Sequence, residues 1–251
     1  MRLVADVHGA AEALERVARL GGPLLILGDL INFIDYRTYE GIVTEVSGRE
    51  FTVEMVRLRT AGRFTEARGL WRSFSDGREA ELRARYDELI DAAYVDVCAA
   101  LEHAEDVYVT FGNVDRPDLL ARHLPARARF VDAEVVEIDG LAVGFAGGGI
   151  TSIGTAGEVT EDEMADKLDR LGRIDVLCTH VPPSIDALAT DVVGGRSKGS
   201  EAIVDYLDRA RPGFHYFGDI HQGRATTWRH GTTRCVNVGY FRATGRAIRH
   251  G

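Results

Sequence analysis

The sequence predicts a mixed α/β fold, and three observations point to it. Short apolar runs recur along the chain and end in Gly, Asp, Asn or His, as buried strands do before a loop. Stretches with a helical spacing of apolar residues lie between these runs. Residues 129–147 and 224–240 instead alternate apolar and polar residues between glycine turns, which is typical of antiparallel strands. We therefore expect mixed rather than purely parallel sheets.

Five apolar runs are expected to form buried strands: residues 3–5, 24–27, 107–111, 174–178 and 214–217. Each run is followed within two residues by an Asp, Asn or His side chain. Open α/β sheets bind their ligands at the carboxyl ends of the strands. These polar residues are therefore candidates for a functional site.

Helices are expected between the strands. Residues 10–20 place several apolar side chains on one face. Thr160-Glu161-Asp162-Glu163 has the pattern of a capping box and opens a helix that runs to about Leu171. Ser200 is positioned to cap a further helix, which Pro212 ends.

The segment between Asp29 and Asn113 is longer than one crossover between neighbouring strands needs. Residues 42–46 and 51–55 flank a polar turn and predict a β-hairpin, and the apolar spacing of residues 77–103 predicts a long amphipathic helix. We interpret residues 1–251 as one domain with an insertion over about residues 36–104, which offers a surface for a homo-oligomer. The arginines of the insertion either line a substrate mouth or form a solvated face.

The composition narrows the class of protein. The formal net charge is −9 and no run rich in Lys or Arg stands out, which argues against an extended nucleic-acid-binding surface. The apolar runs are far shorter than a membrane span, and the strand-like start leaves no room for a signal peptide. The three cysteines are widely spaced and are expected to be reduced, buried thiols. A cytoplasmic enzyme or binding protein remains.

The strand ends offer one set of polar residues in order: Asp6 and His8, then Gly28-Asp29, Gly112-Asn113, His180, and Asp219 with His221. Each fragment alone is also common in turns. Together they supply carboxylates, imidazoles and one amide oxygen, which are ligands suited to divalent metals. Two adjoining ions that share a carboxylate can generate hydroxide and bind the oxygens of a phosphoryl group.

This order of motifs resembles the calcineurin-like metallophosphoesterase family, whose blocks run D-x-H, G-D, G-N-H-[DE], H and G-H-x-H. They stand here as Asp6-Val7-His8, Gly28-Asp29, Gly112-Asn113-Val114-Asp115, His180 and Gly218-Asp219-Ile220-His221, so the match spans most of the chain. The resemblance implies a four-layer αββα sandwich of two mixed β-sheets flanked by helices, with the site at the strand ends on one edge.

The resemblance also implies a ligand set for two divalent ions. Metal 1 would take Asp6, His8, Asp29 and His221; metal 2 would take Asp29, Asn113, His180 and Asp219. Asp29 would bridge the ions, and Asp29, Asn113 and His180 would carry the catalysis of a small phosphorylated substrate. The nucleophile would be a hydroxide between the ions, so a serine or cysteine nucleophile is not needed.

Two residues depart from the family pattern. Val114 stands where a His usually helps to stabilise the phosphoryl group or to protonate the leaving oxygen, and valine does neither. Asp219 replaces the first His of G-H-x-H, which shifts the preference towards hard ions such as Mn²⁺, with Fe, Zn and Mg as the alternatives, and makes the site less positive. A less positive site holds a dianionic monoester less well, so both departures predict a phosphodiesterase.

Residues outside the motifs give weaker predictions. Arg196, Lys198 and Ser200 lie in a Gly-rich loop that opens a helix, and they either contact the substrate phosphate or belong to a capping loop. Asp115 is expected to cap the helix begun by Arg116-Pro117 and to hold a neighbouring ligand. His215, inside an apolar run, is expected to be a core histidine.

Two other functions remain open. The first is a metal-bound, weakly active regulatory or nucleotide-binding module of the same fold, because Val114 and Asp219 depart from the pattern. The second is a purely structural or interaction protein that uses the insertion, against which the otherwise intact ligand set argues.

Overall fold

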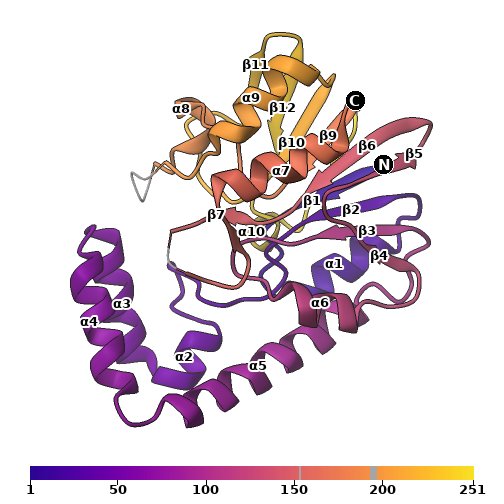
Figure 1. Ribbon diagram of the computed structural model, residues 1–251. Coiled ribbons are helices and arrows are strands. Elements are labelled where there is room, and N and C mark those ends of the chain that lie inside the picture. The colour runs from indigo at the N-terminus through magenta and orange to yellow at the C-terminus, as the bar shows by residue number, and fades with distance from the viewer. Residues whose placement is uncertain (153, 193–196) are drawn as a thin grey trace.

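The computed structural model describes residues 1–152, 154–192 and 197–251, and two β-sheets lie face to face in it (Figure 1). The first sheet has the order β13-β1-β2-β3-β4. Its strands are Ile248–Arg249, Arg2–Val4, Leu24–Leu27, Val107–Thr110 and Ala128–Phe130. β1 to β4 pair in parallel and β13 pairs antiparallel with β1, so the carboxyl ends of β1, β2 and β3 meet at one edge.

The second sheet has the order β11-β12-β10-β9-β6-β5. Its strands are Thr227–His230, Thr233–Asn237, Phe214–Phe217, Val176–Thr179, Leu141–Ala146 and Glu134–Ile138. The inner pairs are parallel and the two outer pairs are antiparallel. The prediction of antiparallel strands is confirmed for β5–β6 and β11–β12. It is wrong for residues 128–130, which join the first sheet parallel to β3.

Burial on both faces explains why the strands read as continuous apolar runs. Leu3 and Leu25 pack between the sheets with Phe145 and Val176, whereas Val4 and Ile26 face the helices on the other side. Helices α1 (Ala11–Ala18), α5 (Glu79–Ala99) and α6 (Pro117–His123) contribute to the core over the first sheet. α7 (Glu161–Leu171) and α9 (Glu201–Ala210) cover the second sheet. The fold is an αββα sandwich, as predicted.

Capping residues set the starts of the helices on the second sheet. The Thr160 side chain accepts from the Glu163 N–H while the Glu163 carboxylate accepts from the Thr160 N–H, which is a complete capping box. The Ser200 hydroxyl accepts from the Ile203 N–H at the start of α9. Both caps confirm the sequence prediction. The short elements are β7 (Gly149–Ile150), β8 (Glu158–Val159), α8 (Asp186–Ala189) and α10 (Phe241–Thr244).

The hairpin predicted over residues 42–55 is wrong, because this part of the insertion is helical. α2 (Ile42–Ser47) and α3 (Arg49–Thr60) are joined by Gly48, whose φ of 82° turns the chain without a strand reversal. α4 (Phe64–Ser75) follows, and Met55 and Leu58 of α3 pack with Ala67 of α4 in a small core of their own. A strand over residues 51–55 with alternating apolar and polar side chains would bury Val53, but the Val53 side chain is exposed.

The long helix predicted over residues 77–103 is confirmed as α5. Its carboxyl-terminal half buries Ile90, Tyr94 and Val97 in the core over the first sheet. Its other end extends away from the sandwich with α3 and α4 (Figure 1). The arginines there form exposed ion pairs with acidic residues three positions away in the sequence, namely Arg57–Glu54, Arg63–Glu66, Arg78–Glu81 and Arg85–Glu88. These ion pairs favour the interpretation that the arginines form a solvated face over the interpretation that they line a substrate mouth.

Candidate metal centre

All the candidate ligands follow strands whose carboxyl ends lie at one edge of the sandwich. Asp6 and Asp29 follow β1 and β2, Asn113 follows β3, His180 follows β9, and Asp219 and His221 follow β10. Hydrogen bonds join these loops within and between the sheets: the Gly218 N–H donates to the His180 carbonyl within the second sheet, and the Asp219 N–H donates to Asp6 Oδ2 of the first sheet at 3.1 Å. The structure therefore brings together ligands from residues 6 to 221.

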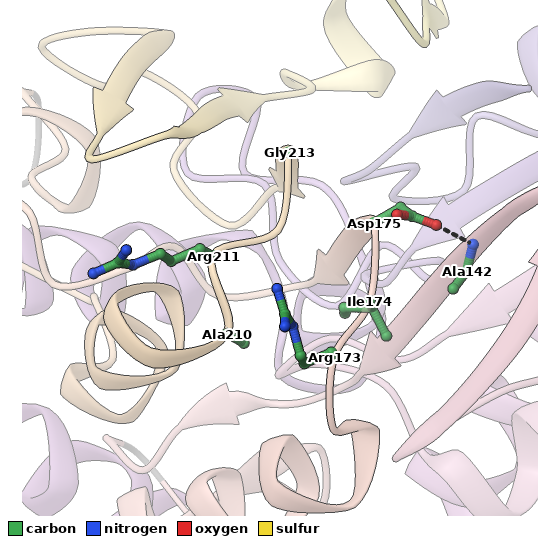
Figure 2. Close-up of a pocket in the computed structure, with 7 residues that line it drawn as sticks. All are labelled: Ala142, Arg173, Ile174, Asp175, Ala210, Arg211 and Gly213. Atoms are coloured by element: carbon green, nitrogen blue, oxygen red, sulfur yellow. Dashed lines mark hydrogen bonds between the residues drawn. The ribbon is translucent and has the colours of Figure 1, made fainter.

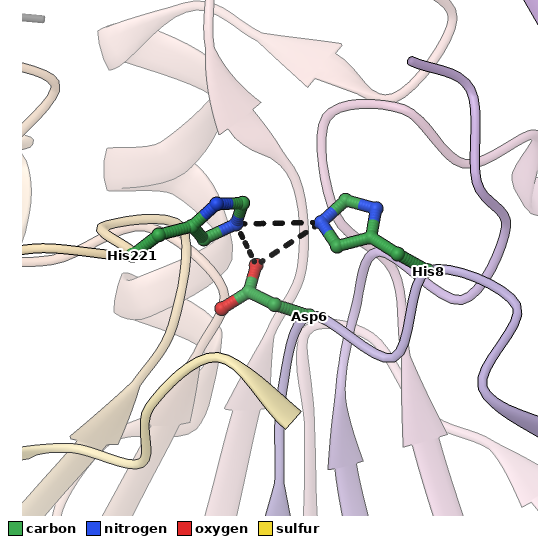
Figure 3. Close-up of side chains that lie close together, drawn as sticks. All are labelled: Asp6, His8 and His221. Carbon is green, nitrogen blue, oxygen red and sulfur yellow. Dashed lines mark hydrogen bonds and ion pairs between the residues drawn. The ribbon is translucent and has the colours of Figure 1, made fainter. Parts of the chain in front are cut away.

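Asp6, His8 and His221 form the first ligand group (Figure 3). The two imidazole Nε2 atoms are 3.3 Å apart, and Asp6 Oδ1 lies 3.4 Å from that of His221 and 3.9 Å from that of His8. Around an ion with ligands at about 2.1 Å, neighbouring donor atoms lie roughly 3.0–3.4 Å apart. The donor set and its spacing fit one divalent ion.

Asp29 and His180 form the second ligand group together with Asp6, which belongs to both groups, and Asn113 lies beside them. His180 Nε2 lies 3.5 Å from Asp29 Oδ1 and 3.2 Å from Asn113 Oδ1. The other carboxylate oxygen of Asp29, Oδ2, lies 3.7 Å from His8 Nε2. Asp29 thus presents one oxygen to each group, which is the arrangement that a bridging ligand needs.

The two buried imidazoles are oriented by backbone carbonyls. His8 Nδ1 faces the Ile31 carbonyl at 3.2 Å, and His180 Nδ1 faces the Leu27 carbonyl at 2.8 Å. A carbonyl only accepts hydrogen bonds, so the Nδ1 atoms carry the protons and the Nε2 lone pairs point into the centre. This is the outer-shell arrangement that holds metal-ligating histidines.

Asp115 fixes the loop after β2 rather than capping a helix. Its buried carboxylate accepts from the N–H groups of Asp29, Leu30 and Gly112 at 2.7, 3.0 and 2.8 Å. The cap of α6 is Arg116, with no side-chain cap, so the capping prediction is wrong. The predicted hold on a neighbouring ligand agrees with these contacts, because the donating N–H of Asp29 belongs to the ligand itself. Burial and the Asp29 carboxylate raise the pKa of Asp115 to about 6.

Four candidate ligands have a backbone conformation that side chains rarely adopt. The φ angles of Asp6, His8, Asp29 and Asp219 are 56°, 43°, 52° and 61°. Aspartate tolerates this region better than most residues, but each such residue still stores strain, of order 1–3 kcal/mol. Strained residues of this kind cluster at active sites and ligand clamps, so the backbone is a second reason to regard this edge as a candidate functional site.

The glycines of the motifs are required by close approach of the strand ends. A Cβ on Gly28 would collide with the Gly112 backbone, and one on Gly112 would collide with the Asp29 carboxylate. A Cβ on Gly218 would lie 2.5 Å from Ala5 Cβ and 2.8 Å from Asp6 Oδ2. The loops can therefore place their ligands within one centre only if these residues lack a side chain.

The ionisable groups of the centre carry an excess of negative charge, which favours cations. Burial raises the pKa of Asp6, but the neighbouring imidazoles of His221, His180 and His8 outweigh it and lower that pKa to about 2. Burial lowers the pKa of His180, and the carboxylates of Asp29, Asp219 and Asp6 outweigh it and raise that pKa to about 9. The raised pKa of His180 reports an excess of buried negative charge around it, and divalent ions, which would bind the Nε2 lone pair in place of a proton, would neutralise that charge.

A group of residues that sequence analysis did not single out supports the first ligand group. Tyr240 stacks on His221 with ring centroids 4.0 Å apart, and the Arg37 guanidinium lies over the Tyr240 ring at 5.0 Å from its centroid. Arg242 donates to the His8 carbonyl at 2.7 Å and pairs with Asp35, which also accepts from the Tyr240 hydroxyl. These residues are distant in sequence and follow no motif, so no pattern in the chain could have found them.

Tyr94 is the other supporting residue that was missed. Its buried hydroxyl donates to Asp115 Oδ1 at 3.1 Å and accepts from the Arg116 N–H at 2.7 Å. Its position four residues after Ile90 is typical of the apolar face of a helix and gives no sign of these hydrogen bonds. The insertion helix thus contributes a hydrogen bond to the shell around Asp29.

The three predicted substrate residues have different outcomes. Arg196 lies outside the described residues. The Ser200 hydroxyl donates to Glu161 Oε2 at 2.7 Å and caps α9, so the capping alternative accounts for it. The Lys198 ammonium is inside the centre, where it donates to Asp219 Oδ1 at 2.6 Å.

A hollow of about 220 Å³ lies elsewhere on the molecule (Figure 2). It is lined by residues at the amino ends of β6, β9 and β10, including Ala142, Arg173, Asp175 and Gly213, and Asp175 Oδ2 accepts from the Ala142 N–H across its rim. The candidate metal centre lies at the opposite, carboxyl ends of β9 and β10. This hollow is therefore separate from the centre.

Comparisons with known proteins bear on the fold of this chain and not on its function. No protein-family model matches the sequence, and the curated proteins give no match either. One crystal structure, which carries no functional name, matches 96% of this chain and 90% of its own with a TM-score of 0.58 and 14% identity. The crystal structure of TT1561 of Thermus thermophilus matches 98% of this chain and 96% of its own with a TM-score of 0.52 and 12% identity. At these identities the likeness shows the fold alone.

Proposed function

We propose that this protein is a metal-dependent phosphoesterase that prefers phosphodiesters, of small or nucleotide-like size. The observation that carries the proposal is the position of Asp29, whose two oxygens lie 3.7 and 3.5 Å from the Nε2 atoms of His8 and His180. Two donor sets that share one carboxylate are the arrangement of two-metal hydrolytic sites. Mn²⁺ is the expected ion, because most donors are hard oxygens.

When bound, the ions would supply a nucleophile at neutral pH and stabilise charge on the phosphoryl oxygens. The chain's own residues hold and orient them. Asp6 and Asp29 supply negative charge from fixed positions, because backbone hydrogen bonds tie their loops to each other, from the Asp6 N–H to the Gly28 carbonyl and from the His8 N–H to the Asp29 carbonyl. His8 and His180 present Nε2 because carbonyls hold Nδ1, and Asn113 adds a neutral amide oxygen.

The preference for diesters follows from Val114 and Asp219. The Val114 N–H donates to Asp29 Oδ1 at 3.1 Å, while its side chain packs against the core, where it supplies neither a proton nor a charge. Asp219 adds a carboxylate where the family pattern has an imidazole. The missing histidine matters less for a substrate whose leaving group departs without a proton. The added carboxylate repels a substrate with one negative charge less than it repels a dianionic monoester.

The proposal includes a reducing, cytoplasmic setting. Cys98, Cys178 and Cys235 are all free, buried thiols, as proteins of reducing compartments have them. In the described part of the chain, no helix has both the length and the apolar character of a transmembrane segment. A homo-oligomer through the insertion stays a prediction.

Steady-state rates with mono-(p-nitrophenyl) and bis-(p-nitrophenyl) phosphate, each with Mn²⁺, Mg²⁺, Zn²⁺ or EDTA, test the proposed function. We expect metal-dependent turnover with kcat/KM at least tenfold higher for the diester, as about 1.4 kcal/mol of difference would give. A clear monoester preference would overturn the diester assignment. Equal rates in EDTA and in metal would overturn the metal-dependent reaction itself.

One observation favours a weakly active regulatory or nucleotide-binding module as the second candidate. Asp219, a proposed ligand of the second ion, is engaged by Lys198. Tight binding of a nucleotide without turnover in the same metal screen would support this candidate.

A further inference from the structure

Lys198 provides a positive charge of the protein's own at the second ligand group. Its Nζ lies 2.6 Å from Asp219 Oδ1, and the Asp219 side chain is only 6% exposed. The Lys198 side chain is 41% exposed, so it reaches the centre from the solvent side. Lys167 and Lys198 are the only lysines in a sequence with 30 basic residues. A lysine ammonium is a compact point charge, which fits the space of a cation better than the broad guanidinium of arginine.

The ammonium and a second ion would need the same oxygen. Asp219 Oδ1 lies 4.0 Å from His180 Nε2, so it is also the oxygen that would complete the second ligand group. In the first ligand group, Asp6 is instead paired with the imidazoles of His8 and His221, which are themselves ligands. Among the described residues, a lysine therefore pairs with Asp219 but with neither Asp6 nor Asp29.

We infer that Lys198 is a built-in competitor of the second metal ion, and that the two metal positions consequently differ in affinity. The first group binds a divalent ion tightly. The second group binds an ion only when the ammonium leaves Asp219 Oδ1, and it is then filled at a much higher metal concentration. This inference rests on the proposed function, because it assumes that both groups are metal sites.

The test is the binding of Mn²⁺ to the full-length protein, measured by equilibrium dialysis with elemental analysis and by calorimetry, without any substrate. For the wild type we expect one ion per chain that survives dialysis and a second that binds at least about tenfold more weakly, because a like charge must be displaced. Lys198→Met keeps the length of the side chain and removes its charge. We expect the second ion to bind this variant at least about tenfold more tightly than the wild type.

Two further variants separate the effect of Lys198 from a general change in charge. Arg224→Met removes one positive charge from the neighbouring loop, where Arg224 forms an exposed ion pair with Asp186, and should leave both affinities unchanged. Lys198→Arg keeps the charge and should keep the second ion weak.

The outcomes are distinguishable. Two ions of equal affinity in the wild type, or the same second affinity in Lys198→Met as in the wild type, would overturn the inference while leaving a metal-dependent phosphoesterase intact. No bound ion in any variant would contradict the proposed function, and the inference would fall with it.

Discussion

At the scale of single residues, Tyr94 links the insertion helix to the candidate metal centre through one hydroxyl group. Tyr94→Phe removes the donor to Asp115 and the acceptor for the Arg116 N–H but keeps the ring in its apolar contacts. We expect a loss of about 1–3 kcal/mol in the free energy of unfolding, because buried polar partners are left unsatisfied. Urea unfolding of both proteins measures it. An unchanged unfolding midpoint would show that this hydroxyl contributes nothing.

We expect His215 to make the stability of the fold depend on pH, independently of the candidate metal centre. Its Nε2–H donates to the Thr179 hydroxyl, which itself donates to the Val181 carbonyl, and within the described chain its buried Nδ1 finds no hydrogen-bond partner. Burial lowers the pKa of His215 to about 3. The unfolded chain, in which a histidine has a pKa of about 6.5, therefore binds a proton that the folded chain excludes, and stability falls as the pH is lowered through that window.

The size of this effect follows from linkage. Between pH 6.5 and pH 5 the wild type should lose roughly 1–2 kcal/mol of unfolding free energy through His215 alone. His215→Gln does not titrate, so its stability should fall less over the same interval, measured by urea unfolding of metal-free protein in EDTA. Parallel pH curves for the two proteins would refute the buried neutral imidazole.

At the scale of elements, the glycine at the end of β3 decides whether the strand ends can converge. Gly112→Ala places a methyl group against the Asp29 carboxylate and the His180 ring, and we expect a loss of more than about 2 kcal/mol together with weaker metal binding. Gly69→Ala is the matched control: Gly69 lies within α4, and a Cβ there meets nothing within 4 Å. It should stabilise the protein by roughly 0.5–1 kcal/mol. Thermal unfolding of both variants checks this, and equal stabilities would contradict it.

Short sequence patterns correctly predicted the elements that depend on contacts between neighbouring residues. The capping box at Thr160 and the cap at Ser200 each depend on residues within one helical turn, and both are present. The hairpin over residues 42–55 failed because a five-residue alternation cannot distinguish a strand from a helix, and the packing of Met55 against α4 decides the outcome. Tyr94, Tyr240 and Arg242 reach the centre only through the tertiary fold, so no spacing in the sequence reveals them.

At the scale of the whole molecule, the insertion divides into two parts. The carboxyl-terminal half of α5 belongs to the core over the first sheet, whereas α3 and α4 share a separate small core around Met55, Leu58 and Ala67. Replacing residues 49–77 by a short Gly-Ser linker should therefore leave the sandwich folded and its tightly bound ion in place. Circular dichroism and metal content measure the result. An unfolded or metal-free product would show that α3 and α4 are part of the main core.

Most of the candidate site could be predicted from the order of the polar residues that follow the strands. Seven residues between Asp6 and His221 were predicted as ligands from their positions after apolar runs and from the family resemblance, and the structure brings them to one edge of the sandwich. The sequence could not reveal that Asp219 is paired with Lys198, because the two residues are 21 positions apart and meet only in the tertiary fold. That one contact separates two ligand groups that look alike in sequence.

The bridging position of Asp29 is tested most directly by Asp29→Asn, assayed with bis-(p-nitrophenyl) phosphate and Mn²⁺. An amide keeps the shape of the side chain but loses the charge that two ions would share, so we predict a fall in kcat of at least about a thousandfold, as loss of a group central to charge stabilisation produces. Asp208→Asn, which alters an exposed carboxylate paired with His230, serves as the control and should retain full activity. A rate for Asp29→Asn within a few-fold of the wild type would contradict the account.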